Sequence, residues 1–120
     1  MKKLLITLLL ISPFSFADWG DVYYCQMTTF SETTLEGKRT NYTLQKFTFK
    51  LDKTKNAMVF GKDGYLNSDM ELREGATFPS IEYWYADGLY SRASFDKGKI
   101  LYAMVGDEEV TTISANCDKF

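Results

Sequence analysis

Apolar residues in this chain recur mainly at every second position, and that period limits the folds open to it. From residue 18 onward, no long stretch repeats apolar side chains at the helical spacings of three and four. A two-residue period is typical of strands that bury one face. The sequence therefore predicts an all-β domain.

Turn residues divide the alternating stretches into short strands. Asp-Gly at 87–88 and Lys-Gly at 97–98 are typical of an antiparallel meander. The strand candidates are 22–30, 40–51, 57–60, 65–67, 70–73, 80–85, 89–95, 99–105 and 110–117. In the second of these the apolar parity switches, which predicts a β-bulge near Gln45 and Lys46. We expect a small antiparallel meander barrel, complete or flattened, of about eight strands, whose interior is either filled or holds one small ligand.

The first 17 residues have the layout of a secretory signal peptide. Lys2 and Lys3 form a basic start, an apolar run covers 4–11, and small residues at 15 and 17 suit signal peptidase. The apolar run is too short for a membrane span, which needs roughly 20 residues. We predict cleavage after Ala17, a mature domain of 18–120 without a stable membrane anchor, and a periplasmic or secreted location in a Gram-negative bacterium.

Cys25 and Cys117 are the two cysteines of the chain. Because an exported chain folds in an oxidising compartment, the sequence predicts one disulfide between them. They lie too far apart in sequence for a redox Cys-x-x-Cys pair. The disulfide would place the first and last strands side by side, with Cα atoms roughly 4.4–6.8 Å apart, and would close the sheet.

Composition excludes several classes of function. The chain has no His, which removes Ser-His-Asp and Cys-His nucleophiles, His-ligated zinc and the usual general base at neutral pH. With 14 Lys and Arg against 16 Asp and Glu and no basic stripe, it also lacks the charge that nucleic-acid binding needs. We therefore predict a protein that is not an enzyme, with no catalytic residue, no cofactor and no nucleic-acid partner.

Acidic residues give no metal site. Four of them gather in one segment: Asp63, Asp69, Glu71 and Glu74. The first and last are spaced like positions 1 and 12 of an EF-hand loop. However, Tyr65 and Ser68 occupy the places of a ligand and of the turn glycine. The acidic run 107–109 falls at an expected hairpin tip, where solvated charge is ordinary and a partner-binding role is the alternative.

Aromatic residues provide the candidate binding site. Tyr83, Trp84 and Tyr85 alternate along one expected strand, so Trp84 takes one face of the sheet and both tyrosines take the other. Exposed amphipathic aromatics are typical anchors for a partner. The alternative is that the tyrosines belong to the core and Trp84 packs under a loop. Tyr24, on the parity opposite Cys25, and Tyr90 are similar candidates.

Two resemblances accompany these patterns. The segments 18–25 (DWGDVYYC) and 113–120 (ISANCDKF) look like the ends of small uncharacterised exported proteins of marine Gram-negative bacteria, which implies no particular activity. A Tyr-x-Cys opening strand and a Cys near the end of the chain are similar to periplasmic C-type lysozyme inhibitors, which implies a small barrel. Gly88–Ser94 shares only the composition of their inhibitory loop, so no inhibitory residue is assigned.

Together these features predict an exported binding module. Its ligand is either a small apolar molecule inside the barrel or a protein partner on the aromatic strands 80–95. The alternative function is a periplasmic lysozyme-type inhibitor.

Overall fold

The computed structural model describes residues 17–74 and 84–120. These residues form β1 (Val22–Thr34), β2 (Arg39–Asn41), β3 (Lys46–Asp52), β4 (Ala57–Phe60), β5 (Met70–Glu74), β6 (Trp84–Asp87), β7 (Ser91–Asp96), β8 (Lys99–Val105) and β9 (Glu109–Lys119). Residues 1–16 of the predicted signal segment lie outside the described ranges. No helix within the described ranges is long and apolar enough to span a membrane.

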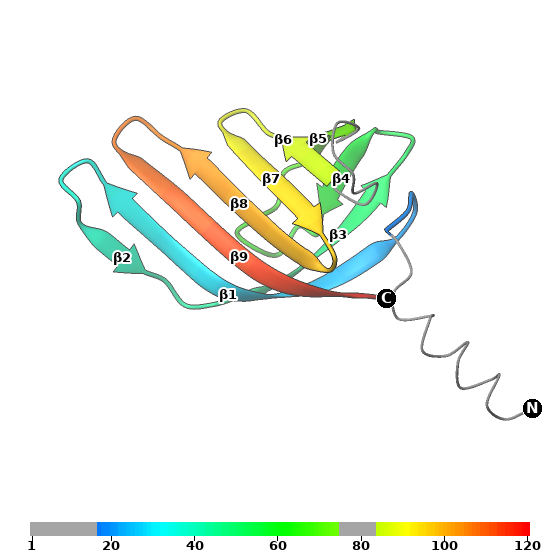
Figure 1. Cartoon of the computed structure of the whole chain (residues 1–120), viewed down its shortest axis with the longest axis horizontal. Coiled ribbons are helices and arrows are strands. Elements are labelled where there is room, and N and C mark those ends of the chain that lie inside the picture. Colours follow the sequence, from blue (N-terminus) through cyan, green and yellow to red (C-terminus); the bar gives the residue numbers. More distant parts are fainter. Residues whose placement is uncertain (1–16, 75–83) are drawn as a thin grey trace, which may run out of the picture.

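The strands form one antiparallel sheet that closes on itself. Neighbouring strands pair in the order β2-β1-β3-β4-β5-β6-β7-β8-β9, and β9 pairs again with β1. The closed barrel has eight strands, β1 and β3–β9, with β2 beside the far half of β1. In Figure 1, β1, β9, β8 and β7 slant across one side of the barrel, and β3 and β4 lie behind them. The predicted all-β barrel is confirmed.

β1 is longer than predicted. It continues from Phe30 to Thr34, through a polar segment that the sequence placed in a turn. Those residues keep their pairing with β9, from Ser31 opposite Thr112 to Thr34 opposite Glu109. The polar composition of this segment wrongly predicted a turn, because threonine is also favoured in strands.

The predicted parity switch in the second strand is a break rather than a single bulge. β2 ends at Asn41 and β3 begins at Lys46. Residues 42–45 between them belong to neither strand, although Tyr42 and Gln45 keep backbone hydrogen bonds with β1. On the neighbouring strand, the pairing of β1 with β9 shifts register between Met27 and Thr29. This register shift reverses which alternate residues of the strand face the core. Apolar side chains therefore point inward on both sides of it.

The predicted short strand 65–67 does not form. Residues 61–69 are a loop between β4 and β5, and Leu66 inserts its side chain into the core with 4% of it exposed. One buried residue on a loop produces the same short alternation of polar and apolar residues as a strand. The wrong prediction follows from that ambiguity.

The later hairpins follow the prediction closely. β8 has its predicted limits, and β7 and β9 differ from theirs by one or two residues. Lys97 and Gly98 have φ values of 52° and 76°, which is the type I′ geometry that suits a two-residue hairpin turn. β6 continues to Asp87, so the next turn lies at 88–90 instead of 86–88. Residues 80–83 of the predicted strand lie outside the described ranges.

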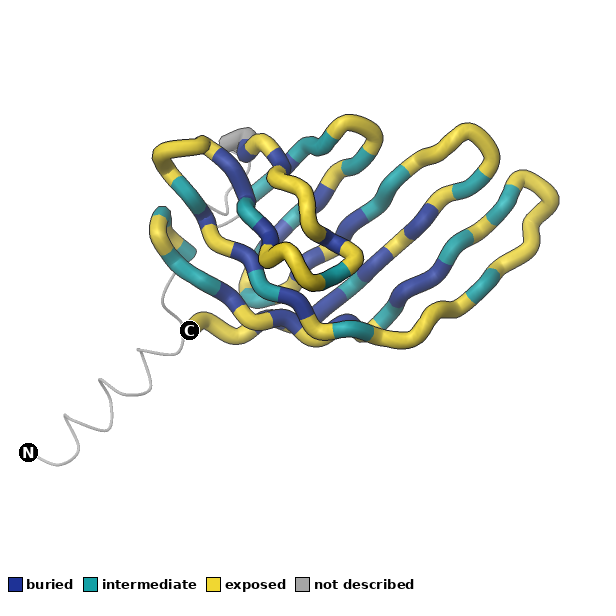
Figure 2. The backbone as a smooth tube through the Cα atoms, turned by 180° about the vertical axis from the view of Figure 1, so that it is seen from behind, coloured by how far each residue is buried: buried dark blue, intermediate teal, exposed yellow. Residues whose placement is uncertain are grey.

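Aromatic side chains fill the centre of the barrel. The ring of Phe49 lies 5.2 Å from that of Tyr23 and 5.1 Å from that of Phe95, and Tyr23 and Phe95 are 4.8 Å apart. Phe49 and Phe95 are each 1% exposed. Buried and exposed positions alternate along the strands around them (Figure 2). Eight strands enclose a space that side chains of this size can fill.

One end of the barrel is covered by two indoles. The rings of Trp19 and Trp84 meet edge to face, with centroids 5.0 Å apart, and both pack against the core together with Ala17. The indole N–H of Trp84 is buried and has no hydrogen-bond partner among the described residues. Trp84 therefore serves packing at this end.

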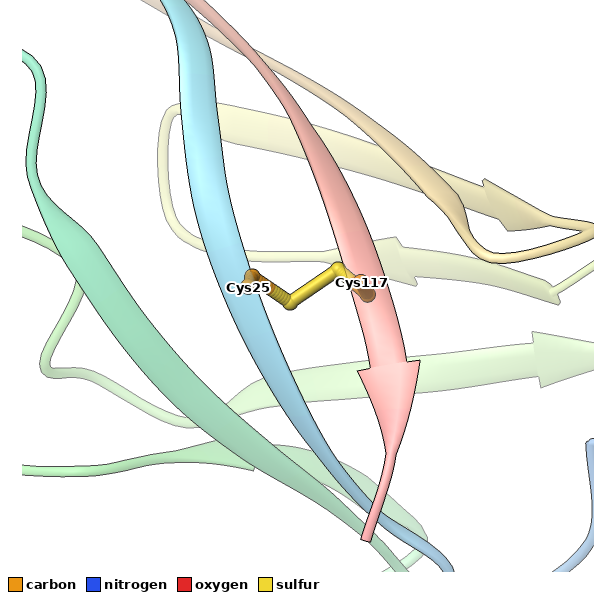
Figure 3. Close-up of a disulfide and its surroundings, with 2 residues drawn as sticks. All are labelled: Cys25 and Cys117. Atoms are coloured by element: carbon orange, nitrogen blue, oxygen red, sulfur yellow. A yellow bond between two sulfur atoms is a disulfide. The ribbon is translucent and has the colours of Figure 1, made fainter.

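The predicted disulfide between Cys25 and Cys117 is confirmed (Figure 3). The two residues lie directly opposite each other on β1 and β9. Their Cα atoms are 4.0 Å apart, shorter than the predicted range and close to the roughly 4.5 Å of a directly opposed antiparallel pair. The disulfide links the first and last strands at the seam where the barrel closes.

Candidate functional site

The turns at the other end of the barrel form a continuous rim. Because the strands are antiparallel, turns 35–38, 88–90 and 106–108 lie at the same end as loop 61–69. The N–H of Leu35 donates to the carbonyl of Glu108 at 2.9 Å, and the N–H of Val105 donates to the carbonyl of Tyr90 at 2.9 Å. The three hairpin tips stand in a row in Figure 1. We call this end, with its four connections, the open end.

Most of the exposed large apolar side chains of the described residues lie at the open end: Leu35, Tyr65, Leu89, Tyr90, Val105 and Val110. The most accessible, Leu35, Leu89 and Tyr90, are 77%, 87% and 69% exposed. Figure 2 shows the hairpin tips as exposed segments. Single exposed apolar residues are ordinary, but a group on one surface marks an interaction site.

Below the rim, tyrosines and carboxylates gather around Phe30. The ring of Phe30 lies 5.1 Å from Tyr42 and 4.9 Å from Tyr65. Glu32 accepts a hydrogen bond from the phenol of Tyr42, and the charge of Glu109 acts on the same phenol. We call these five residues the tyrosine–carboxylate cluster.

Two phenols at this end have raised pKa values. Desolvation raises the pKa of Tyr42 most, followed by the negative charge of Glu32. Burial raises the pKa of Tyr102, whose hydrogen bond with Ser91 acts in the opposite direction. Both phenols therefore stay neutral over the whole physiological range and can act as hydrogen-bond donors.

Replacing Glu32 by glutamine should lower the Tyr42 pKa toward the ordinary tyrosine value of 10.0. In the parent, the folded-state pKa lies above that of the unfolded chain, so stability falls as pH rises past about 10. The variant should reduce that loss. Ultraviolet titration of tyrosinate and denaturation at alkaline pH measure both effects, with Glu36→Gln as the control on the nearby turn. An unchanged titration curve would contradict the contact.

A pocket of about 390 Å³ opens between loop 61–69 and turn 88–90. Its lining combines Tyr65, Tyr90, Tyr102 and Met104 with the polar Ser91 and Asp69. It adjoins the tyrosine–carboxylate cluster through Tyr65. This concave, partly apolar surface can take a side chain of a partner.

The structure does not bring Trp84, Tyr85 and Tyr90 of the predicted aromatic site together, and the fourth residue of that site is Tyr83. Tyr83 lies outside the described residues. Trp84 faces the core, whereas Tyr85 is half-buried on the outer face opposite Ser94. Tyr90 is the member that lies at the open end. Sequence reasoning missed Tyr42 and Tyr65 because it placed them in the expected strands 40–51 and 65–67, where a tyrosine is ordinary.

The structure offers no metal site within the ranges that it describes. No group of three His, Cys, Asp or Glu side chains there lies close enough to hold an ion. The acidic segment beginning at Asp63 is therefore not assembled into a coordination shell there. Asp69 instead lies 3.8 Å from the ammonium of Lys55.

No protein family, curated protein or solved structure matches this chain. The two resemblances drawn from the sequence therefore stay predictions, and function must be inferred from the chemistry of the surface.

Proposed function

We propose that this chain is an exported, non-enzymatic binding module that takes a protein partner at the open end. The observation that carries the proposal is the gathering of exposed apolar side chains there. The packed rings of Tyr23, Phe49 and Phe95 favour a protein partner over a small apolar ligand in the barrel. Apolar anchors beside a concave pocket are typical of protein interfaces.

Charge at the open end favours a basic partner. Glu32 and Glu109 are half-buried and form no salt bridge with any described residue. Asp107 and Glu108 add negative charge at the neighbouring tip. Complementary charge speeds association and disfavours acidic competitors.

The disulfide supports the exported location. Structural disulfides persist in the periplasm or outside the cell and are rare in the cytosol. Cys25 and Cys117, which form this disulfide, are both buried residues, 3% and 8% exposed. The protein would therefore bind its partner in the periplasm or in the extracellular medium.

A lysozyme-type inhibitor is the second candidate. It is favoured by the position of Gly88–Ser94, the segment that shares its composition with the inhibitory loop of the similar proteins. Residues 88–90 of this segment lie on the rim of the open end. A lysozyme would then be the partner bound there.

Replacing Leu89 and Tyr90 together by serine should weaken partner binding by at least about tenfold, because both side chains are exposed anchors. Native mass spectrometry of the protein purified from its own periplasm identifies the partner, and titration calorimetry compares the variants. Leu101→Ser, at a position 61% exposed outside the open end, is the matched control.

Stoichiometric inhibition of a lysozyme that the double variant abolishes would identify the second candidate. Equal partner affinity of the double variant and the parent would overturn the proposed surface. A small apolar molecule retained in the barrel, with no protein partner, would overturn the proposed function.

A further inference from the structure

A separate groove of about 650 Å³ lies on the outer face of β9, β1 and β3. Two rows of outward side chains cross these strands, Asp118–Tyr24–Thr48 and Asn116–Gln26–Lys46. Loop residues from Gly61 to Gly64, including Asp63, form one wall. The groove shares no lining residue with the exposed apolar set of the open end.

The wall of the groove is held close to the sheet. The N–H of Gly61 donates to the carbonyl of Thr48 at 3.0 Å and so continues the ladder of β3. A Cβ atom at Gly61 would lie 2.7 Å from the hydroxyl oxygen of Thr48. A larger residue would force the Thr48 side chain to shift, so glycine at this position favours the close approach of the loop that forms this side of the groove.

Tyr24 provides an aromatic surface in the groove. Its side chain is 50% exposed. The ring of Phe120 meets it at an interplanar angle of 67°, with centroids 5.2 Å apart. This contact from the side restrains the tyrosine ring and leaves half of the side chain accessible, which suits it to stack on a flat ligand.

The polar groups around Tyr24 are mixed in sign and type. Asn116 and Gln26 each carry an amide that donates and accepts, whereas Asp118 and Asp63 only accept. Lys46 supplies the one ammonium group among the lining residues. The amide of Gln26 donates to the carbonyl of Met27 at 3.2 Å, which orients it along the strand.

We infer that this groove binds a neutral saccharide. A pyranose ring has an apolar C–H face that can lie on Tyr24, and hydroxyls around its rim that both donate and accept hydrogen bonds. Amides and carboxylates match such hydroxyls because they supply both kinds of partner. The size of the groove leaves room for a short oligosaccharide.

Other ligand classes fit the groove less well. Two carboxylates against one ammonium disfavour a phosphate or a nucleic acid. An acyl chain is disfavoured because it would bury the charged and amide groups of the lining without hydrogen-bond partners. An added peptide strand would need a free edge, but here β1 already pairs with β3 and β9 on its two sides.

Titration with three pentasaccharides tests the inference: β-1,4-linked glucose, β-1,4-linked N-acetylglucosamine and α-1,4-linked glucose. At least one should bind and shift the backbone amide resonances of Gln26 and Asn116. Tyr24→Ala should weaken binding by about tenfold, whereas Tyr24→Phe should retain it, because stacking needs the ring and not the phenol oxygen. Asp118→Asn should also weaken it.

The control variant is Tyr90→Ala at the open end, which should bind the saccharide like the parent. Circular dichroism establishes that each variant is folded. Absence of binding to all three sugars up to about 10 mM would overturn the inference, since that corresponds to less than about 3 kcal/mol of affinity. Equal affinity of Tyr24→Ala and the parent, or loss of binding in Tyr90→Ala, would also overturn it.

Discussion

Replacing Phe49 by alanine should lower the free energy of unfolding by about 3–5 kcal/mol. The ring is 1% exposed and lies within 6 Å of the rings of Tyr23, Phe60 and Phe95. Its removal loses buried apolar area and leaves a cavity among aromatic rings that cannot move freely into it. Urea denaturation followed by circular dichroism measures the loss.

Phe120→Ala is the matched control for this prediction. It makes the same chemical change at a side chain that is 84% exposed, so its effect should stay within about 0.5 kcal/mol. If Phe49→Ala cost no more than Phe120→Ala, the centre of the barrel would not be packed. A small apolar ligand inside the barrel would then regain support.

The core was predictable because the two-residue period survives in most strands. In β3, for example, Phe47, Phe49 and Leu51 alternate with polar residues and are all buried. The two-residue period does not identify every core residue, as Ala86 and Ala93 show. They face each other on β6 and β7 and are fully buried, yet their small size gives little signal in a sequence.

The placement of the site was harder to predict, because it depends on which turns share an end. In an antiparallel meander, each added strand sends the chain to the opposite end of the barrel. Counting 65–67 as a strand would move every later turn, including that of Tyr90, away from Leu35. It would also make the first and last strands parallel, whereas β1 and β9 are antiparallel.

The tyrosine–carboxylate cluster depends on the two segments that break the strand pattern. Tyr42 reaches Phe30 because it directly follows β2 and its N–H donates to the carbonyl of Phe30, and Tyr65 reaches it from loop 61–69. Neither contact follows from a two-residue period. Irregular segments therefore build the candidate site, while the regular strands hold it in place.

The Cys25–Cys117 disulfide joins β1 to β9 and so couples the open end to barrel closure. These strands pair over eleven positions, from Tyr23 with Lys119 to Thr34 with Glu109. Glu32 and Glu109 of the proposed partner surface lie on the same two strands. A loosened seam would therefore disturb the binding surface as well as the core.

Replacing both Cys25 and Cys117 by serine should lower the free energy of unfolding by about 2–5 kcal/mol. The disulfide spans 92 residues of sequence, so the oxidised parent has a much more restricted unfolded chain than the variant. The fold should persist, because the ladder between β1 and β9 and the aromatic core do not need the sulfur atoms. Denaturation under non-reducing conditions measures the difference, and circular dichroism checks the fold.

A second variant with alanine at both positions separates two causes of the loss. Serine places a hydroxyl at each buried site, with a desolvation cost of about 1–3 kcal/mol for each one left without a hydrogen bond. Alanine adds no polar group, so its remaining loss reports the freed unfolded chain and the missing sulfur contacts. The parent treated with a reductant should lie close to the alanine variant. A double variant as stable as the oxidised parent would show that the β1–β9 ladder alone closes the barrel.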